Sequence, residues 1–295
     1  MRDVRPEIRE CYVPVRGARL FVREVGSARP LIVLHGGPDF NHAYFLPEMD
    51  SMGSVFRLIY YDQRGRGKSS AGVLPSDVTM ESEVEDLDEI RRHLGLDRIA
   101  VMGHSWGGVL AMEYAARHPE RISHLILLNT APASREDALK FREGRRAMEG
   151  EGLDRMRAIA STRAYKDGDI ETEAEYYAIH FRRAVSPDRL EQVVRGLRSH
   201  FTPVDIVKAR TIEERLYAET WEVPGYDLVP RLAASRPPTL VIHGDRDFLP
   251  LNISKRIADS VPRARLVVVE DCGHFSYLER PTEVLAAVAK HLEDG

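Results

Sequence analysis

Short runs of apolar residues recur along residues 10–130 and 236–292, and most of these runs end at a glycine or a polar turn. Runs that are apolar throughout are typical of strands buried on both faces of a parallel sheet. Two β-rich runs around Gly17 predict a hairpin at the start of the chain. The predicted strands are Cys11–Val15, Leu20–Glu24, Leu31–Leu34, Phe56–Tyr61, Ile99–Met102, Leu125–Leu128, Thr239–Ile242 and Leu266–Val269.

Helical patterns separate these strands. Residues 84–94 have apolar side chains at helical spacing, after a candidate N-cap at Asp77 or Thr79 and before a stop at Gly95. Strand–helix alternation of this kind predicts an α/β sheet with right-handed crossovers. Three further helices are expected at residues 109–117, 253–261 and 285–292.

The middle of the chain has a different secondary-structure pattern. Residues 132–235 contain almost no β-rich run and carry charged, helical patterns with scattered aromatic residues. We therefore predict a core of residues 1–132 and 236–295 with a helical cap at 133–235; the alternative is an ordinary second helical domain whose aromatic residues form its own core. The predicted cap helices are Arg135–Gly150, Leu153–Ala164, Thr172–Val185, Pro187–Ser199 and Val204–Leu216.

Composition excludes several classes of protein. The 295 residues include 42 Lys and Arg and 46 Asp and Glu, so no basic surface for nucleic acid or anionic membrane is indicated. The longest apolar run, Val284–Ala289, is too short to span a membrane, and Met1–Glu10 lacks the apolar segment of a signal peptide. The two cysteines, Cys11 and Cys272, are expected to be free thiols in a cytoplasmic protein.

One serine lies within a recognisable motif. Residues 103–107 read Gly-His-Ser-Trp-Gly, which matches G-x-S-x-G between a predicted strand and a small-residue helix. A serine at such a turn presents its hydroxyl above the sheet edge, and the flanking glycines keep side chains from colliding. The helix N-terminus behind it favours developing negative charge. Ser105 is therefore the candidate nucleophile; the alternative is a purely structural turn.

A serine nucleophile needs a base and a third group that orients the base. His274 follows the last predicted strand and is the candidate base. Asp245 and Asp247 both follow the preceding strand, and the spacing alone leaves both open as the acid. These residues would meet at the carboxyl edge of a parallel sheet.

Backbone donors for an oxyanion come from two places. Residues 35–38 read His-Gly-Gly-Pro directly after a predicted strand, and paired glycines expose backbone N–H groups. An oxyanion hole takes one donor from such a loop and one from the residue after the nucleophile. The candidates are the N–H groups of Gly37 and Trp106; the alternative for the loop is a plain turn.

Residues 62–69, Asp-Gln-Arg-Gly-Arg-Gly-Lys-Ser, suggest a phosphate-binding loop but do not match one. That motif needs glycine where this chain has Asp62. We interpret the stretch as a structural loop held by Asp62 and Arg64. No metal-binding or dinucleotide-binding motif is present in the sequence, so no metal or cofactor is expected.

These motifs together resemble the α/β-hydrolase superfamily and, within it, the proline iminopeptidase branch. The pairing of His-Gly-Gly-Pro at 35–38 with Asp-Gln-Arg-Gly at 62–65 is fairly specific to that branch. The resemblance implies an eight-stranded, mostly parallel α/β-hydrolase sheet with an inserted helical cap. It also implies a triad of Ser105, Asp247 and His274, with oxyanion donors at Gly37 and Trp106. In one departure, Asp39 stands where the family usually has a fifth-position glycine.

The resemblance implies a serine hydrolase that cleaves a small ester or amide through an acyl-enzyme. Proline iminopeptidases release an N-terminal residue, often proline, from a small molecule or short peptide. One alternative is a carboxylesterase or lactonase acting on small neutral esters. The other is a non-catalytic ligand-binding protein, which the complete set of Ser, Asp and His disfavours.

The candidate substrate-binding residues differ between an aminopeptidase and an esterase. Proline iminopeptidases hold the free amine of the substrate with acidic residues, mostly from the cap, and the candidates here are Glu213, Glu214, Glu219 and Glu222. An ester-binding pocket would instead be apolar. The candidates for it are Phe248, Tyr217 and Trp221, together with Trp106.

Overall fold

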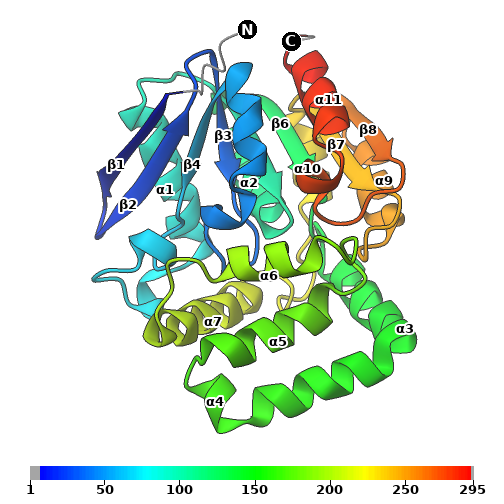
Figure 1. Ribbon diagram of the computed structural model, residues 1–295. Coiled ribbons are helices and arrows are strands. Elements are labelled where there is room, and N and C mark those ends of the chain that lie inside the picture. The colour runs from blue at the N-terminus through cyan, green and yellow to red at the C-terminus, as the bar shows by residue number, and fades with distance from the viewer. Residues whose placement is uncertain (1–6, 294–295) are drawn as a thin grey trace, which may run out of the picture.

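The computed structural model describes residues 7–293, built around one eight-stranded sheet (Figure 1). The strand order is β1-β2-β4-β3-β5-β6-β7-β8, with antiparallel pairs β1–β2 and β2–β4 and parallel pairs elsewhere. The predicted eight-stranded, mostly parallel α/β sheet is therefore confirmed. The strands are β1 Ile8–Val15, β2 Ala18–Val25, β3 Arg29–Leu34, β4 Phe56–Tyr61, β5 Ile99–His104, β6 Ile122–Leu128, β7 Thr239–Gly244 and β8 Ala264–Val269.

Helices cover both faces of this sheet, so its central strands are apolar on both sides. Along β3, Ile32 and Leu34 belong to one core cluster, whereas Leu31 and Val33 belong to the other. The first cluster includes residues of α1, α2, α8 and α9, and the second includes residues of α11. The helices of these layers are α1 Met80–His93, α2 Trp106–Arg117, α8 Val229–Ser235, α9 Leu251–Ser260, α10 Ser276–Glu279 and α11 Pro281–Glu293.

Between β6 and β7 the chain forms helices, five of which lie below the sheet in Figure 1. They are α3 Arg135–Ser161, α4 Arg163–Lys166, α5 Ile170–Phe181, α6 Leu190–Leu197 and α7 Pro203–Ala218. Helix α3 bends at Glu149, where φ is −128° and ψ is 25°, close to the predicted break between two helices. We call α3 to α7 the cap; the domain boundaries at 133 and 235 stay a prediction.

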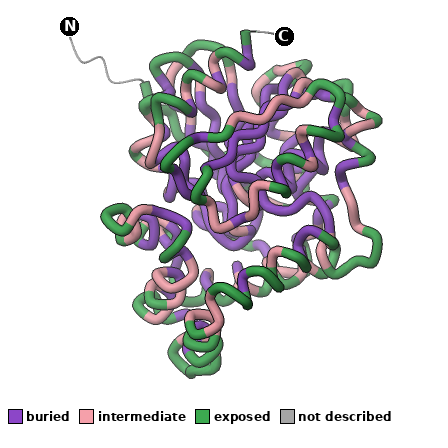
Figure 2. The backbone as a smooth tube through the Cα atoms, turned by 90° about the vertical axis from the view of Figure 1, so that its right-hand side faces the viewer, coloured by how far each residue is buried: buried purple, intermediate pink, exposed green. Residues whose placement is uncertain are grey.

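The sequence analysis missed α8. This helix has seven residues, too few for its apolar positions to show a helical period. Its buried Val229 and Leu232 belong to the core cluster that α2 and α9 share, so α8 packs on the sheet layer rather than within the cap. Figure 2 shows the buried backbone concentrated in the core, while the outer surfaces of the cap are exposed.

Short 3₁₀ helices connect the larger elements: η1 His42–Phe45, η2 Glu48–Ser54, η3 Gly67–Ser69, η4 Pro75–Asp77 and η5 Pro119–Arg121. Helix α1 begins after Thr79, whose hydroxyl accepts the backbone N–H of Ser82 at 3.1 Å, which decides between the two N-cap candidates.

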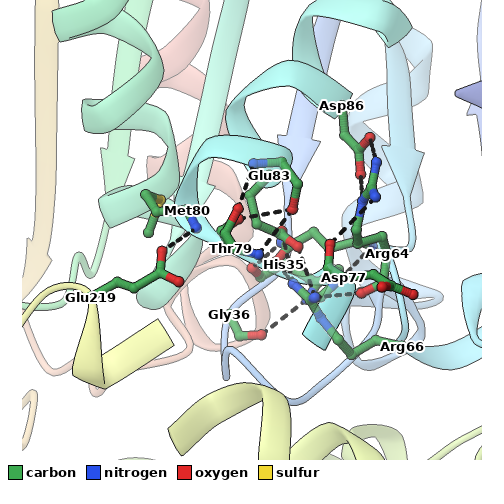
Figure 3. Close-up of polar contacts among 12 residues, drawn as sticks. His35, Gly36, Arg64, Arg66, Asp77, Thr79, Met80, Glu83, Asp86 and Glu219 are labelled. Atoms are coloured by element: carbon green, nitrogen blue, oxygen red, sulfur yellow. Dashed lines mark hydrogen bonds and ion pairs between the residues drawn. The ribbon is translucent and has the colours of Figure 1, made fainter. Parts of the chain in front are cut away.

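Two buried ion pairs hold the loop after β4 (Figure 3). The Arg64 guanidinium donates to Asp86, and Arg66 donates to Glu83 at 2.8 Å through both terminal nitrogens. All four side chains are at most 7% exposed. Removing one partner of such a pair would leave a buried charge uncompensated. These ion pairs therefore fix the loop to helix α1 and give it a structural role.

The same loop fixes the strand end that carries His35. The N–H of Gln63 donates to His35 Nε2 at 3.0 Å, and His35 Nδ1 lies 3.0 Å from the carbonyl oxygen of Gly36. Asp62 accepts the N–H groups of His42 and Lys68. These bonds require a neutral His35, because its Nε2 acts as an acceptor. Burial lowers the pKa of His35 to about 3.

This buried histidine predicts a loss of stability in acid. Its pKa is about 3 in the folded protein and close to 6.5 when unfolded, so below pH 6.5 the unfolded chain binds the extra proton. The stabilisation is present above pH 6.5 and is lost as the pH falls, by about 2 kcal/mol at pH 5. We expect His35→Gln, which keeps an acceptor for Gln63, to lose less stability than the parent protein between pH 7.5 and 5.

Urea unfolding at the two pH values measures this difference, and His93→Gln, at an exposed position on α1, is the matched control. Equal pH dependence in the parent protein and His35→Gln would contradict the account.

Candidate active site

Ser105 lies at the turn between β5 and α2. Its backbone is in an unusual positive-φ conformation, with φ 54° and ψ −120°. A Cβ atom on Gly103 would overlap the backbone of Gly107, and one on Gly107 would overlap the carbonyl oxygen of Leu34. Only glycine fits at these two positions, so the predicted strand–turn–helix geometry is present.

His274 and Asp247 meet at the ends of the last two strands. Nδ1 of His274 lies 3.0 and 3.1 Å from the two carboxylate oxygens of Asp247, and both side chains are at most 2% exposed. Burial alone would raise the pKa of Asp247, but the pairing with His274 outweighs it and lowers the pKa below its usual value. The ionised carboxylate fixes the proton of His274 on Nδ1, which leaves Nε2 free to accept a proton.

Asp245 is placed differently. It accepts the backbone N–H of Cys272 at 3.0 Å and is exposed. The contact with His274 therefore belongs to Asp247 and not to Asp245.

Asn129 also contacts this acid, and the sequence analysis did not find it. Its Nδ2 donates to Asp247 at 2.8 Å and to the carbonyl oxygen of Gly273 at 3.1 Å. Its own Oδ1 accepts the hydroxyl of Ser276. The available signal was its position directly after β6, at the same sheet edge as the other strand-end residues.

A small pocket brings three of the predicted residues together. Gly37, Ser105 and His274 line it, beside the aromatic rings of Phe40, Phe181 and Phe275. Among residues 7–293, no acceptor takes a hydrogen bond from the N–H of Gly37 or Trp106. Two backbone donors beside the hydroxyl of a serine suit an oxyanion.

A chain of hydrogen bonds joins the two loops that form this pocket. The N–H of Gly36 donates to the Tyr44 hydroxyl at 2.7 Å, and that hydroxyl donates to His104 Nδ1 at 2.8 Å. His104 Nε2 in turn lies 2.9 Å from the carbonyl oxygen of His274. Burial, followed by the neighbouring His274, lowers the pKa of His104 to about 3, so this ring stays neutral.

The predicted aromatic substrate residues pack against His274 or Trp106. The ring of Phe248 is 4.8 Å from that of His274. The rings of Tyr217 and Trp221 are 5.4 and 5.1 Å from that of Trp106. The structure thus places all three aromatic side chains against the predicted triad or its neighbour.

The four candidate glutamates are separated by the fold. Glu213 is half-buried and accepts the hydroxyl of Tyr217 at 2.7 Å. Glu214, one residue later on α7, is exposed. Glu219 accepts the backbone N–H of Met80 at 2.8 Å (Figure 3), and Glu222 is exposed. Of these carboxylates, Glu213 is the one joined to an aromatic residue that packs on Trp106.

A family model described as the alpha/beta hydrolase fold matches residues 29–281. The chain belongs to this family. A relative from Clostridium botulinum, named as a proline iminopeptidase, is 30% identical over 97% of this chain and 98% of its own length. Resemblance to the proline iminopeptidases therefore extends through the cap.

Solved α/β hydrolases agree. The proline iminopeptidase of Mycobacterium smegmatis has a TM-score of 0.71 and 26% identity, covering 97% of this chain and 98% of that one. A thermophilic esterase from Thermogutta terrifontis has a TM-score of 0.71 at 24% identity, over 97% and 98% of the two chains, which shows the shared fold. This α/β hydrolase is thus of the aminopeptidase or esterase type.

Residues 7–293 contain neither a candidate membrane span nor a candidate metal site. No helix there is long and apolar enough to cross a membrane. No group of three or more His, Cys, Asp or Glu side chains in that range is arranged to hold a metal ion.

Tyr44→Phe tests the hydrogen-bond chain between the two loops. The variant leaves the N–H of Gly36 and Nδ1 of His104 without their shared partner, and an unsatisfied buried group costs about 1–3 kcal/mol. We expect kcat to fall roughly 10-fold with little change in KM. The reason is that the loop with Gly36 and Gly37 and the loop with His274 would no longer be held in one relative position. Steady-state kinetics on one substrate, with a thermal melt to show folding, measures this. An unchanged kcat in a folded variant would show that the chain is not needed for positioning.

Proposed function

We propose that this chain is a serine aminopeptidase of the proline iminopeptidase type, which releases the N-terminal residue of a short peptide. The observation that carries the proposal is the carboxylate of Glu213, which makes no ion pair among the described residues and accepts the hydroxyl of Tyr217, whose ring packs on Trp106, the residue after Ser105. The 30% identical relative, which is named as a proline iminopeptidase, supports it.

The triad supplies the chemistry in this proposal. His274 takes the proton from Ser105 as the serine oxygen attacks the scissile carbonyl, while Asp247 stabilises the charged imidazole. The N–H groups of Gly37 and Trp106 hold the oxyanion. The leaving amine takes its proton from His274, and water then repeats these steps on the acyl-enzyme.

A cluster of charges under the cap supports binding of a substrate amine. Asp39 and Glu173 are both paired with Arg198, and Glu173 also pairs with Arg210 at 2.7 Å. With Glu213, the cluster contains three carboxylates and two guanidinium groups. One ammonium group would balance it.

The pKa of Glu213 reflects this imbalance. Burial and then the nearby carboxylate of Asp39 raise it to about 8, against the smaller lowering effects of Tyr217 and Arg198. A substrate ammonium placed beside Glu213 would favour the ionised carboxylate. Binding of a free amine is therefore coupled to loss of the proton from Glu213.

An esterase remains the second candidate, because the catalytic pocket is rich in aromatic rings. Phe40, Phe181 and Phe275 line it, and they present apolar surface to an acyl group. The same triad would cleave an ester. The two candidates differ in whether a free amine on the substrate is required.

Glu213→Gln tests the amine requirement. We expect the parent protein to cleave L-proline p-nitroanilide and to leave the N-acetylated compound intact. Because a hydrogen bond to a charged group contributes about 1.5–3 kcal/mol, Glu213→Gln should lower kcat/KM for the free amine roughly 10- to 100-fold. In the parent protein, kcat/KM should rise from pH 7 to 8 as Glu213 ionises, and this rise should be absent in Glu213→Gln.

Glu214→Gln is the matched control, since that carboxylate is exposed one residue away on the same helix. Cleavage of p-nitrophenyl butyrate without cleavage of the free-amine anilide would overturn the aminopeptidase and favour the esterase.

A further inference from the structure

A second, larger pocket lies within the cap, between the two halves of α3 and the helices α5 and α7. Its volume is about 400 Å³. In Figure 1 the second half of α3 runs along the outside of α5, so the bend at Glu149 folds α3 around this space. We call it the cap pocket. Its apolar wall includes Phe141, Leu153, Met156 and Tyr176.

Four arginines line the cap pocket: Arg142, Arg145, Arg146 and Arg157. Arg145 is buried, donates to the carbonyl oxygen of His180 at 2.8 Å and pairs with Glu149 at 3.3 Å.

Arg157 pairs with Asp154. Arg142 lies over the ring of Tyr217, at 5.9 Å, and within residues 7–293 neither Arg142 nor Arg146 has a carboxylate partner. Four guanidinium groups thus face two carboxylates, so the pocket has an excess of positive charge above an apolar wall.

The cap pocket is separated from the reaction by a single layer of aromatic rings. On one side Tyr217 and Trp221 line the pocket and pack on Trp106, the residue after Ser105. On the other side Phe141 lines the pocket and lies 5.5 Å from the ring of Phe248, which contacts His274. The cap pocket therefore adjoins the residues that contact Ser105 and His274, and a substrate that reaches both would pass between these rings.

We propose that the cap pocket binds the C-terminal carboxylate of the leaving segment, so that the substrates are short zwitterionic peptides with a free C-terminus. The assignment rests on the proposed aminopeptidase function. Glu213 would hold the ammonium end, and Arg142 and Arg146 would hold the carboxylate end. Tyr217 marks the boundary, since its hydroxyl bonds Glu213 while its ring lines the pocket.

The physical basis is the pairing of a guanidinium with a carboxylate. Such hydrogen bonds are charge-assisted and favour arginine because its planar fork matches both oxygens. The apolar wall would contact an aliphatic side chain next to that carboxylate. A volume of about 400 Å³ suits one or two residues rather than a long chain.

The experiment compares three ligands: prolyl-leucine, prolyl-leucinamide and prolyl-glutamic acid α-amide. They carry, respectively, a C-terminal carboxylate, no carboxylate and a side-chain carboxylate. Dissociation constants are measured calorimetrically with Ser105→Ala, so that binding is observed whether or not the protein cleaves peptides. Turnover of prolyl-leucinamide by the parent protein reports separately on the proposed function.

We expect prolyl-leucine to bind about tenfold more tightly than its amide, and this ratio to fall when salt is raised because Arg142 and Arg146 are exposed. In Arg142→Gln combined with Arg146→Gln, the ratio should fall close to one. Arg155→Gln is the matched control: this arginine is exposed on the same helix, pairs with Glu175 and does not line the pocket. Its ratio should equal that of the parent protein.

Equal binding of the free acid and the amide would overturn the proposal. So would tighter binding of the side-chain acid than of prolyl-leucine, which would assign the arginines to an acidic residue instead. Failure to cleave any of the peptides, with the tenfold binding ratio intact, would overturn the proposed function and leave the cap pocket as a carboxylate site.

Discussion

The backbone at Ser105 is the constraint on which the site depends. A residue with φ of 54° between a buried strand and a helix is strained, and the surrounding fold must hold it there. Gly103 and Gly107 permit it, because any side chain at either position would overlap backbone. Once this turn is fixed, Ser105 lines the same pocket as Gly37 and His274. The parallel sheet then supplies the other members at its carboxyl edge.

Buried ion pairs hold the cap in place on the core. Arg198 forms ion pairs with Asp39, which follows the Gly36–Gly37 loop, and with Glu173 on α5. Its side chain is almost fully buried. Charges that are buried and paired hold segments in one relative position, because separating them would leave a charge without compensation. The cap also holds an unmatched carboxylate, Glu213, at the hydroxyl of Tyr217, and unmatched guanidinium groups along the pocket that the ring of Tyr217 lines. A ligand that carries both charges fits this arrangement better than a neutral one.

Much of this architecture follows from local sequence. The strands were predicted because each is a short apolar run, and Ser105 and His274 because each follows such a run beside a glycine. Asp247 could not be separated from Asp245 by spacing, whereas the structure places it against His274. The contact between Asp39 and Arg198 spans 159 positions and depends on how the cap docks, which no local pattern encodes. Asn129 was predictable from the sequence, since it too follows a strand at the same sheet edge.

The most direct test of the account is covalent capture of the nucleophile. The protein is treated with a fluorophosphonate, and the site of the adduct is located by mass spectrometry, with Ser105→Ala treated in parallel. The account predicts one adduct per chain, on Ser105, and none in the variant, because the strained turn presents Ser105 in the pocket that Gly37 and His274 also line, with His274 paired to Asp247. An adduct on a different serine, or an unmodified protein under conditions where a known serine hydrolase is fully labelled, would contradict it.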